Sequence, residues 1–421
     1  MKILWFSNTP ANANEYYNRE LKGTGGWLKA LNAELQNYVE LHIAFYGQQN
    51  EVFKYQETTY YSIKRFSSQL NKAIRILNPK PIDQEDLFRY LKIIEIVKPD
   101  IIHIHGTENP FACIIPHTNI PVVISIQGII TSIQHQFFSG IDRKYLHIKD
   151  YNLSSLRSLI LSRSFRTGYK PLKKMQKIES KNLKFAENIM GRTAFDRRTT
   201  KILAPKSNYY QDDRVLREGF YLNQWKPHSD SNLIIHTTCG NSFYKGFETL
   251  CLALNELNNV GFNCVWQVAG IKEDDLIVKV VKKMLNDHYP KSGLRLLGNL
   301  NETKLAESLL EADIYVSVSH IDNSPNSLAE AMILGMPCIA SFVGGTGSMI
   351  KDGEEGVLVQ NGDPWVLAGA IIELFNNKEN ATLMGANARK TALKRHDKRR
   401  IVSDLVKSYQ EIIRKHPNNL Q

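Results

Sequence analysis

The chain has 421 residues with a formal net charge of +11; 43% of its residues are hydrophobic and 23% are charged. These values fit a globular protein of two or three domains and exclude an intrinsically disordered chain. No apolar run reaches the ~18 residues that a membrane-spanning helix needs, and the N-terminus turns polar too soon for a secretory signal peptide.

The five cysteines are scattered and form no C-x-x-C pair: Cys113, Cys239, Cys251, Cys264 and Cys338. Their odd number and wide spacing favour reduced thiols over a zinc site or a disulfide framework. We therefore expect a cytoplasmic protein.

The first half of the sequence alternates strand and helix patterns. Runs of β-branched and aromatic residues predict strands, and apolar residues at helical spacing predict helices between them. The predicted strands are 2–7, 41–45, 100–105, 122–127 and the start of 187–193, and the predicted helices are 25–35 and 85–97. This alternation predicts βαβ units around a parallel sheet.

A basic segment extends from Arg157 to Lys184. Nine basic residues are offset there only by Glu179, so 28 residues carry a net charge of +8. Apolar residues are interleaved, and the segment is either a face for anionic lipid or a solvated helical hairpin. No nucleic-acid-binding motif accompanies the charge, so no nucleic-acid partner is expected.

A second alternating series begins at Leu233, after the polar and irregular stretch 221–232. Its predicted strands are 233–238, 264–269, 294–297, 313–318 and 338–342, and its predicted helices are 246–257, 301–312 and two that begin at Ser324-Pro325 and Asp363-Pro364. Ser324 and Asp363 are expected to cap these two helices, and Gly335 to end the first.

These patterns predict an α/β fold of two Rossmann-like, doubly wound parallel-sheet domains that face a cleft. The expected N-terminal domain is 1–222, with the basic helical insert at about 141–186. The expected C-terminal domain is 223–400. We expect the amphipathic C-terminal helix, 401–421, to pack back on the N-terminal domain.

Three glycine-containing loops, 22–27, 238–246 and 343–348, lie where a strand gives way to a helix. Backbone N–H groups in such loops suit an anion, although glycine pairs also make ordinary turns. Lys245 ends the second loop at a helix start, where the macrodipole disfavours a cation. A phosphate beside Lys245 would explain this placement; the alternative is a solvated surface lysine.

Two carboxylates flank the start of one predicted helix. Asp322 follows a strand, and Glu330 is the only charge in the otherwise apolar run 328–334. A nucleotide sugar needs such elements: amides for its diphosphate, a carboxylate for the ribose hydroxyls, and a second for the sugar. The alternative for Glu330 is a charge on a helix surface, which its apolar neighbours oppose.

The stretch that contains these carboxylates resembles retaining glycosyltransferases of family 4, which have the GT-B fold. The family pattern is a glutamate, seven residues, a second glutamate with Ala-Met, then Gly-x-Pro and Val-Gly-Gly. Here it reads Asp322, seven residues, Glu330-Ala-Met332, Gly335-Met-Pro337 and Val343-Gly-Gly345. Other matching segments are 25–28, 98–105 and 245–246, while 323–327 and 191–193 resemble a branch from bacterial surface-polysaccharide clusters.

The resemblance implies a role for each matching residue. Glu330 would hold the ribose, Asp322 would contact the transferred sugar, and Lys245 would neutralise the diphosphate. The 1–222 domain would bind the acceptor and 223–400 the nucleotide sugar. The remaining residues that would line the donor are Asn326, Ser327, Leu328, Gly25 and Gly26.

Three departures from the family pattern stand out. The first glutamate is Asp322, one methylene shorter. Gly240 is followed by Asn241 where the family often has arginine, so the phosphate charge falls to Lys245 alone or with help from Arg192. Gln127 replaces a histidine that helps to position the reacting sugar in many members, and it cannot titrate near neutrality.

The implied activity is hexosyl transfer, with retention and without a metal or other cofactor, from a donor such as a UDP- or GDP-sugar. The implied acceptor is a saccharide, free or lipid-linked, in cell-surface polysaccharide synthesis at the inner face of the cytoplasmic membrane. A nucleotide-sugar epimerase or phosphorylase on the same architecture is an alternative, since fold alone does not decide. A basic, membrane-associated scaffold with a decayed site is another.

Overall fold

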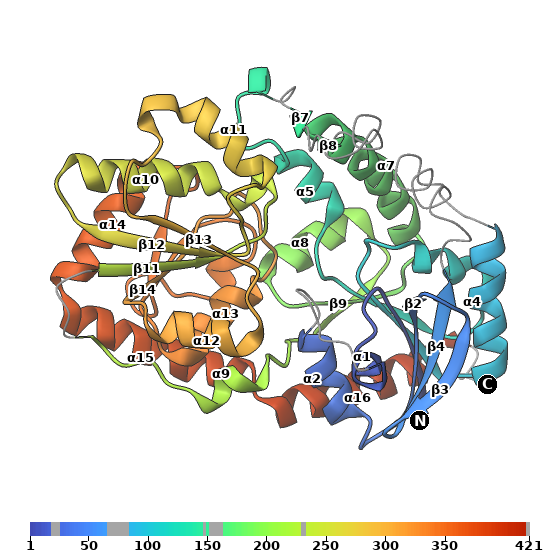
Figure 1. The fold of residues 1–421 in the computed structure, drawn as a ribbon. Coiled ribbons are helices and arrows are strands. Elements are labelled where there is room, and N and C mark those ends of the chain that lie inside the picture. Colours follow the sequence, from blue (N-terminus) through green and yellow to red (C-terminus); the bar gives the residue numbers. More distant parts are fainter. Residues whose placement is uncertain (18–25, 65–83, 146–148, 151–162, 229–232, 418–421) are drawn as a thin grey trace. The chain divides into compact units, whose positions relative to one another are not determined.

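The computed structural model describes residues 1–17, 26–64, 84–145, 149–150, 163–228 and 233–417 (Figure 1). The chain forms two compact units. Unit 1 comprises Met1–Gln134, Lys170–Leu216 and His396–Gln421, and unit 2 comprises His135–Tyr169 and Arg217–Arg395. Each contains one large, predominantly parallel sheet with helices, which confirms the predicted α/β fold of two Rossmann-like domains.

The sheet of unit 1 has eight strands in the order β10-β9-β6-β5-β1-β2-β4-β3. All its strand pairs are parallel except the β3–β4 hairpin. The strand order reverses at the β1–β5 pair, so this pair forms the topological switch point of the unit. The strands are β1 (Lys2–Ser7), β2 (Glu40–Gly47), β3 (Glu51–Tyr55), β4 (Thr58–Lys64), β5 (Ile101–His105), β6 (Val122–Ser125), β9 (Asn188–Gly191) and β10 (Asn208–Gln211).

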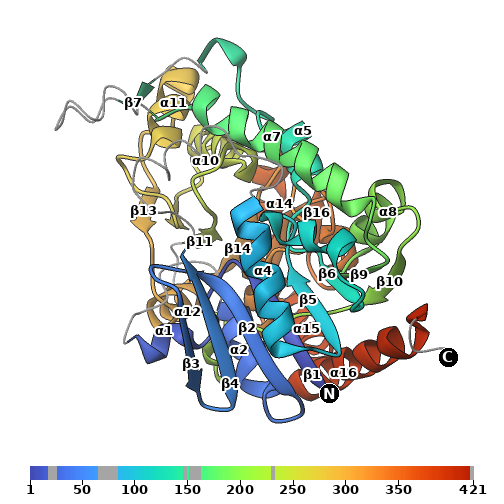
Figure 2. The same ribbon diagram turned by 90° about the vertical axis from the view of Figure 1, so that its right-hand side faces the viewer.

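Helices cover both faces of this sheet (Figure 2). One apolar cluster joins the sheet to α2 and α16, and another joins it to α4 and η1. The helices are α1 (Ala13–Tyr16), α2 (Gly26–Leu35), α4 (Gln84–Val97), η1 (Pro110–His117), α5 (Ile130–Gln136), α7 (Phe165–Leu183), α8 (Ala194–Leu203) and α16 (Lys398–Lys415).

The sheet of unit 2 has six parallel strands in the order β13-β12-β11-β14-β15-β16. Counted along the chain this is 3-2-1-4-5-6, the order of dinucleotide-binding folds, with its switch point at the β11–β14 pair. The strands are β11 (Leu233–Thr238), β12 (Cys264–Ala269), β13 (Leu294–Gly298), β14 (Ile314–Ser317), β15 (Cys338–Ser341) and β16 (Val357–Val359).

The longer helices of unit 2 form layers on both sides of its sheet (Figure 1). They are α10 (Phe247–Asn259), α11 (Leu276–Leu285), α12 (Glu302–Leu310), α13 (Asn326–Leu334), α14 (Pro364–Asn376) and α15 (Lys378–Arg395). The short elements are η2 (Arg143–Tyr145), β7 (Lys149–Asp150), β8 (Arg163–Ser164), α9 (Glu218–Leu222), η3 (Phe243–Lys245), η4 (Asn286–His288) and η5 (Thr346–Ser348).

The predicted helix caps have different outcomes. Asp363 caps α14 by accepting hydrogen bonds from the amides of the first turn, and Gly335 ends α13 with a φ of 88°, both as predicted. The predicted Ser324 cap is wrong. Pro325 is extended and occupies the N-cap of α13 without a side-chain hydrogen bond, and the buried Ser324 hydroxyl contacts Met349 Sδ at 3.5 Å instead.

The limits of the units differ from the expected domains in three respects, of which one is that unit 1 resumes at His396 and not at residue 401. The chain passes from unit 1 to unit 2 at Leu216–Arg217, six residues before the expected boundary at 222. Part of the expected insert, 141–169, clusters with unit 2, where Phe137, Phe138 and Ile141 pack against the apolar core. Residues 146–148 and 151–162 lie outside the described part of the chain.

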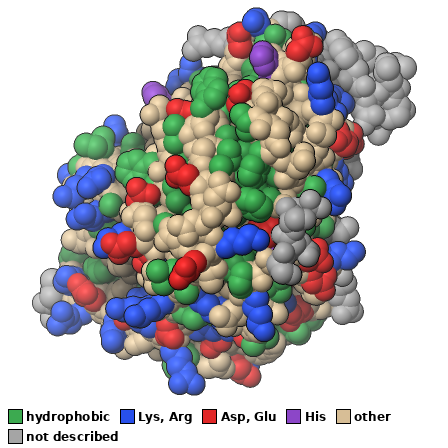
Figure 3. All heavy atoms as spheres, turned by 90° about the vertical axis from the view of Figure 1, so that its left-hand side faces the viewer, with side chains coloured by type: hydrophobic (Ala, Val, Ile, Leu, Met, Phe, Trp, Pro, Cys, Tyr) green, Lys and Arg blue, Asp and Glu red, His purple; other side chains and the backbone are tan. Residues whose placement is uncertain are grey.

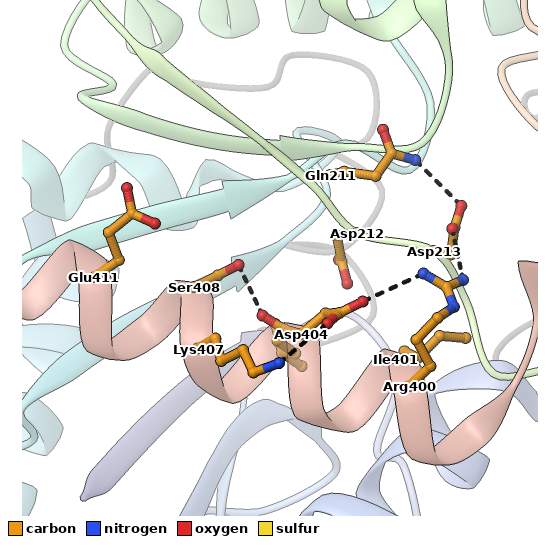
Figure 4. Close-up of a pocket in the computed structure, with 10 residues that line it drawn as sticks. Gln211, Asp212, Asp213, Arg400, Ile401, Asp404, Lys407, Ser408 and Glu411 are labelled. Carbon is orange, nitrogen blue, oxygen red and sulfur yellow. Dashed lines mark hydrogen bonds and ion pairs between the residues drawn. The ribbon is translucent and has the colours of Figure 1, made fainter.

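The C-terminal helix α16 is an integral part of unit 1. Its Tyr409 is fully buried and accepts a hydrogen bond from Trp5 Nε1 at 3.2 Å, and Arg400 donates to Asp213 at 3.0 Å. A polar pocket of about 300 Å³ lies between α16 and the end of β10 (Figure 4). Asp213 and Asp404 pair with Arg400, Asp404 also with Lys407, and Asp212 accepts a hydrogen bond from Ser125 Oγ at 3.0 Å.

No helix among the described residues is long and apolar enough to cross a membrane. On the face seen in Figure 3, acidic and basic side chains are interspersed rather than gathered by sign. The charge excess of the chain is therefore not concentrated on that face.

Candidate active site

The candidate site of unit 2 lies at its switch point, where the loops after β11 and β14 meet. Neighbouring strands at such a point send their following helices to opposite faces of the sheet, which leaves a crevice at their carboxyl ends. Lys245 belongs to the loop after β11 and Asp322 to the loop after β14. The strand order thus brings together two predicted site residues that are 77 positions apart.

Lys245 and Asp322 form an ion pair, with Lys245 Nζ 2.6 Å from Asp322 Oδ2. Their side chains are 24% and 16% exposed, so both remain accessible to a ligand. Burial opposes the charge on Lys245, but the adjacent Asp322 carboxylate outweighs it and raises the lysine pKa above its ordinary value. Lys245 is therefore a fixed positive charge at neutral pH, and not a freely solvated surface lysine.

The two loops are held against each other by backbone contacts. The His320 amide donates to the Tyr244 carbonyl at 2.7 Å. Gly246 has a φ of 75°, and a Cβ there would lie 1.9 Å from the Val318 carbonyl oxygen. Only glycine permits this close approach, so Gly246 is what allows Lys245 to reach Asp322.

The third glycine-containing loop, 343–348, braces Asp322. The Gly345 amide donates to the Asp322 carbonyl at 2.9 Å, and a Cβ at Gly344, whose φ is 48°, would lie 1.9 Å from the same oxygen. The amides of Thr346 and Ser348 donate within the loop. The expectation that this loop offers its amides to an anion is therefore wrong for these groups, because they already have acceptors.

Glu330 is buried on α13, as its apolar neighbours predict, and is only 4% exposed. Arg217 grips it in a bidentate fork, with Nε 2.7 Å from Oε1 and Nη2 2.6 Å from Oε2. Burial raises the pKa of the Glu330 carboxyl, and Arg217 works against this rise. Arg217 was not predicted, since it precedes Glu330 by 113 residues and no local motif marks it.

A second buried pair behind the site was also not predicted. His320 Nε2 lies 2.5 Å from Glu248 Oε1, and His320 Nδ1 lies 2.9 Å from Asn361 Oδ1. Burial opposes the protonation of His320, but Glu248 outweighs it and raises the histidine pKa. The only sequence signal was the position of His320, two residues before Asp322.

The other predicted donor-binding residues of unit 2 lie in the same two loops. Gly240 and Asn241 are exposed, and Asn241 donates to Asp275 at 3.0 Å, so its amide is already engaged. Asn326, Ser327 and Leu328 form the first turn of α13, whose positive dipole end favours anions. Within the described residues, no group of three or more His, Cys, Asp or Glu side chains could hold a metal ion.

The predicted residues of unit 1 form a separate group at the carboxyl end of β6. Arg192 is 5% exposed, and its Nη2 donates to the Gln127 carbonyl at 3.1 Å. Arg192 therefore supports the loop that carries Gln127 from a buried position. Gly26 begins α2, and Gly25 lies outside the described residues.

The sequence and the fold are similar to those of known proteins. Residues 224–391 match the family model described as glycosyl transferases group 1. N-acetyl-alpha-D-glucosaminyl L-malate synthase of Bacillus anthracis is 31% identical over 117 residues, which cover 28% of this chain. The matched stretch spans about a third of that relative's length, 31%.

Solved structures resemble nearly the whole chain at low sequence identity. Sucrose-phosphate synthase from Thermosynechococcus elongatus has a TM-score of 0.72 at 13% identity, covering 97% of this chain and 98% of that one. Anabaena Alr3699/HepE, solved with UDP-glucose, has a TM-score of 0.63 at 14% identity, covering 98% and 100%.

The fold is that of GT-B glycosyltransferases, with two Rossmann-like domains. Residues 224–391 are similar to the glycosyl transferases group 1, the family that the sequence resembles. The predicted family and fold are thereby confirmed.

Proposed function

We propose that this protein is a retaining, metal-independent glycosyltransferase that moves a sugar from a nucleotide-sugar donor to a saccharide acceptor. The observation that carries the proposal is the set of Lys245, Asp322 and Glu330 on the two loop-helix connections of one switch point. A fixed cation, an accessible carboxylate and a buried helical carboxylate match the diphosphate, the sugar and the ribose of one ligand.

The main requirement of the reaction is to stabilise the negative charge that develops on the leaving group. As the glycosidic bond breaks, the diphosphate gains negative charge, and preorganised donors stabilise it most effectively. The Lys245 ammonium has three donors, so it can keep Asp322 and still bind a phosphate oxygen. The first turn of α13 adds its dipole at the same loop.

Glu330 accepts hydrogen bonds from the ribose hydroxyls in this proposal. A carboxylate offers about four lone-pair sites, and Arg217 uses one on each oxygen. The remaining sites suit two neighbouring hydroxyl groups. Arg217 thus orients the carboxylate and keeps it ionised without filling its acceptor capacity.

The donor we favour is a UDP-sugar, since HepE, which resembles the whole chain in fold, was solved with UDP-glucose. Thermal-shift and calorimetric titrations with UDP-, GDP- and ADP-sugars test this choice. Lys245→Ala is expected to weaken donor binding about 10- to 100-fold, as ~1.5–3 kcal/mol for a hydrogen bond to a charged group implies. Lys283→Ala, at an exposed lysine of α11, is the matched control.

Transfer itself is tested by incubating the full chain with donor and a panel of saccharide acceptors. An epimerised donor in the absence of acceptor would instead support the epimerase alternative. Unchanged activity in Glu330→Ala would contradict the assignment of the site and favour a scaffold with a decayed site.

The acceptor is proposed to be a lipid-linked saccharide of cell-surface polysaccharide synthesis, met at an anionic membrane surface in the cytoplasm. The support comes from α7, which faces the viewer in Figure 2. Its buried Glu179 accepts hydrogen bonds from the amides of Ile130 and Thr131 at 2.9 and 2.7 Å. The opposite side carries exposed lysines at helical spacing: Lys170, Lys173, Lys174, Lys177, Lys181 and, just after the helix, Lys184.

This lysine stripe is the described part of the basic segment 157–184; Arg157 and the side chains of Arg163 and Arg166 lie outside it. Binding to vesicles with anionic lipid is expected at low salt and should weaken as salt screens the charges. Changing Lys173, Lys177 and Lys181 together to glutamine should abolish it. If the wild-type protein does not bind anionic vesicles at low salt, the membrane proposal is wrong.

A further inference from the structure

The switch point of unit 1 carries an acidic side chain that no sequence pattern marks. Glu108 lies three residues after β5, one of the two strands at which the order of the unit 1 sheet reverses. Ligands of doubly wound sheets bind at this place. Gln127 follows β6, the next strand of the sheet.

Glu108 and Gln127 are direct neighbours. The point where a Cβ on Gly106 would stand is 1.9 Å from Glu108 Oε2 and 3.3 Å from Gln127 Cδ. A Cβ on Gly128 would lie 3.8 Å from Glu108 Oε1. Gly106 therefore leaves the space in which the Glu108 carboxyl lies near the Gln127 amide.

The loops that carry this pair are fixed on several sides. The Gly106 amide donates to the Ser125 carbonyl at 2.9 Å, and Thr107 Oγ1 donates to the Gly128 carbonyl at 3.2 Å. Arg192 Nη2 donates a hydrogen bond to the Gln127 carbonyl, as described above. Such support from neighbouring groups is what keeps a binding group in one geometry.

The surroundings of the Glu108 carboxyl favour its protonated form. Glu108 Oε2 is shielded from solvent and has no hydrogen-bond partner among the described residues, although the residue as a whole is only half-buried. An unpartnered carboxylate oxygen is costly as a charge. Burial accordingly raises the pKa of Glu108 to about 7, with Glu179 adding to the rise and Arg214 and Arg192 opposing it.

Another unpartnered polar group lies at the same strand edge. Asn12, which follows β1, is 3% exposed, and its Oδ1 has no hydrogen-bond partner among the described residues. Both loops of the unit 1 switch point thus carry a buried polar atom that has no hydrogen-bond partner in the part of the chain that the structure describes. Buried polar atoms in native proteins are nearly always paired, so unpaired ones at a ligand-binding edge point to a ligand.

We propose that Glu108 and Gln127 form a subsite of unit 1 that binds a hydroxyl group of a saccharide, with Glu108 as a hydrogen-bond donor. This proposal rests on the proposed function, and it names a residue to which no role has been given so far. A neutral carboxyl beside a carboxamide offers both donors and acceptors and no charge, which suits a sugar hydroxyl rather than a phosphate. The hydroxyl belongs either to the transferred sugar or to the acceptor.

The test compares Glu108→Gln and Glu108→Ala in the full chain, with the exposed Glu57→Gln as control. The wild-type transfer rate should fall about tenfold between pH 6 and pH 8, as the proton leaves a group with a pKa near 7. Glu108→Gln should lack this fall, because a carboxamide donates at every pH. Glu108→Ala should be tenfold or more slower than the wild type at pH 6 and closer to it at pH 8, while the Kd for UDP alone changes less than twofold.

The Michaelis constants identify the source of the hydroxyl. A raised KM for the donor in Glu108→Ala assigns it to the transferred sugar, and a raised KM for the acceptor assigns it to the acceptor. If both variants keep the wild-type rate, both KM values and the wild-type pH profile, the subsite does not exist.

Calorimetry separates this failure from failure of the proposed function. If the wild-type protein transfers no sugar, the proposed function is wrong, and the subsite is then judged by binding alone. It predicts that UDP-glucose binds more tightly than UDP to the wild type and that Glu108→Ala removes this difference. Equal differences in both proteins would overturn the subsite.

Discussion

Arg217→Met should reveal how the buried carboxylate of Glu330 is maintained. The change removes the guanidinium but keeps most of the apolar stem, and it leaves a carboxylate that is only 4% exposed without its bidentate partner. Breaking a buried ion pair from one side costs about 3–5 kcal/mol. The Arg217 side chain is 20% exposed, so water can partly replace it, and we expect the lower end of this range.

The expected loss of about 3 kcal/mol corresponds to a fall in Tm of roughly 6–12 °C, at about 2–4 °C per kcal/mol. Denaturant unfolding of Arg217→Met, Glu330→Gln and the double variant measures the coupling between the two groups. The double variant should be more stable than Arg217→Met, because no unpaired charge remains. The exposed Arg295→Met serves as control.

Nucleotide binding gives a second readout with a defined sign. Arg217 restrains the rise in the Glu330 pKa that burial causes. Without Arg217 this pKa rises further, so Glu330 takes up a proton at a higher pH than in the wild type and its ribose contact then weakens. The UDP affinity of Arg217→Met should therefore fall at a higher pH than that of the wild type as the solution is acidified. A stability loss below about 1 kcal/mol with unchanged UDP affinity would refute the reasoning.

Two further changes test the loops around the site. Gly344→Ala should destabilise the fold and lower transfer, since the new Cβ would meet the Asp322 carbonyl at 1.9 Å; Gly369→Ala, in α14 with open space around it, should do neither, and equal activity of the two would contradict the bracing role. The folded-state pKa of His320 is raised by Glu248, so the pair's stability is fully present below the unfolded histidine pKa near 6.5 and is lost as pH rises through the folded pKa. Glu248→Gln should flatten this decline in Tm between about pH 6 and 8, and an unchanged decline would exclude the pair as its cause.

The sequence predicted the inner strands of both sheets, because buried parallel strands are marked by continuous β-branched runs. The edge strands β10 and β16 and the β3–β4 hairpin were missed. The hairpin turn passes through Gln56, which has a φ of 52°, where a glycine or asparagine would have signalled the turn. A turn that a glutamine makes under strain leaves no local signal.

In the candidate site, too, some features could be predicted from the sequence and others could not. Glu330 could be predicted as buried from its neighbours along one helix, and Lys245 as unusual from its helix position. The contacts within the site could not be predicted. The pairs Arg217–Glu330, Lys245–Asp322 and His320–Glu248 join residues that are 72 to 113 positions apart. Such contacts are set by strand order, and strand order is a property of the whole sheet.

At both switch points, polar residues lie in the loops after the two central strands, but the charges of these residues differ. In unit 2 the loop after the first strand supplies a cation, Lys245, and the loop after the fourth supplies its partner, Asp322. In unit 1 the corresponding loops after β1 and β5 supply the neutral Asn12 and the proton-holding Glu108. A charged pair suits a diphosphate, and a neutral pair suits hydroxyl groups. The polarity of the residues at each sheet edge thus fits binding of the diphosphate by unit 2, beside its carboxylates for sugar hydroxyls, and recognition of a further hydroxyl group by unit 1.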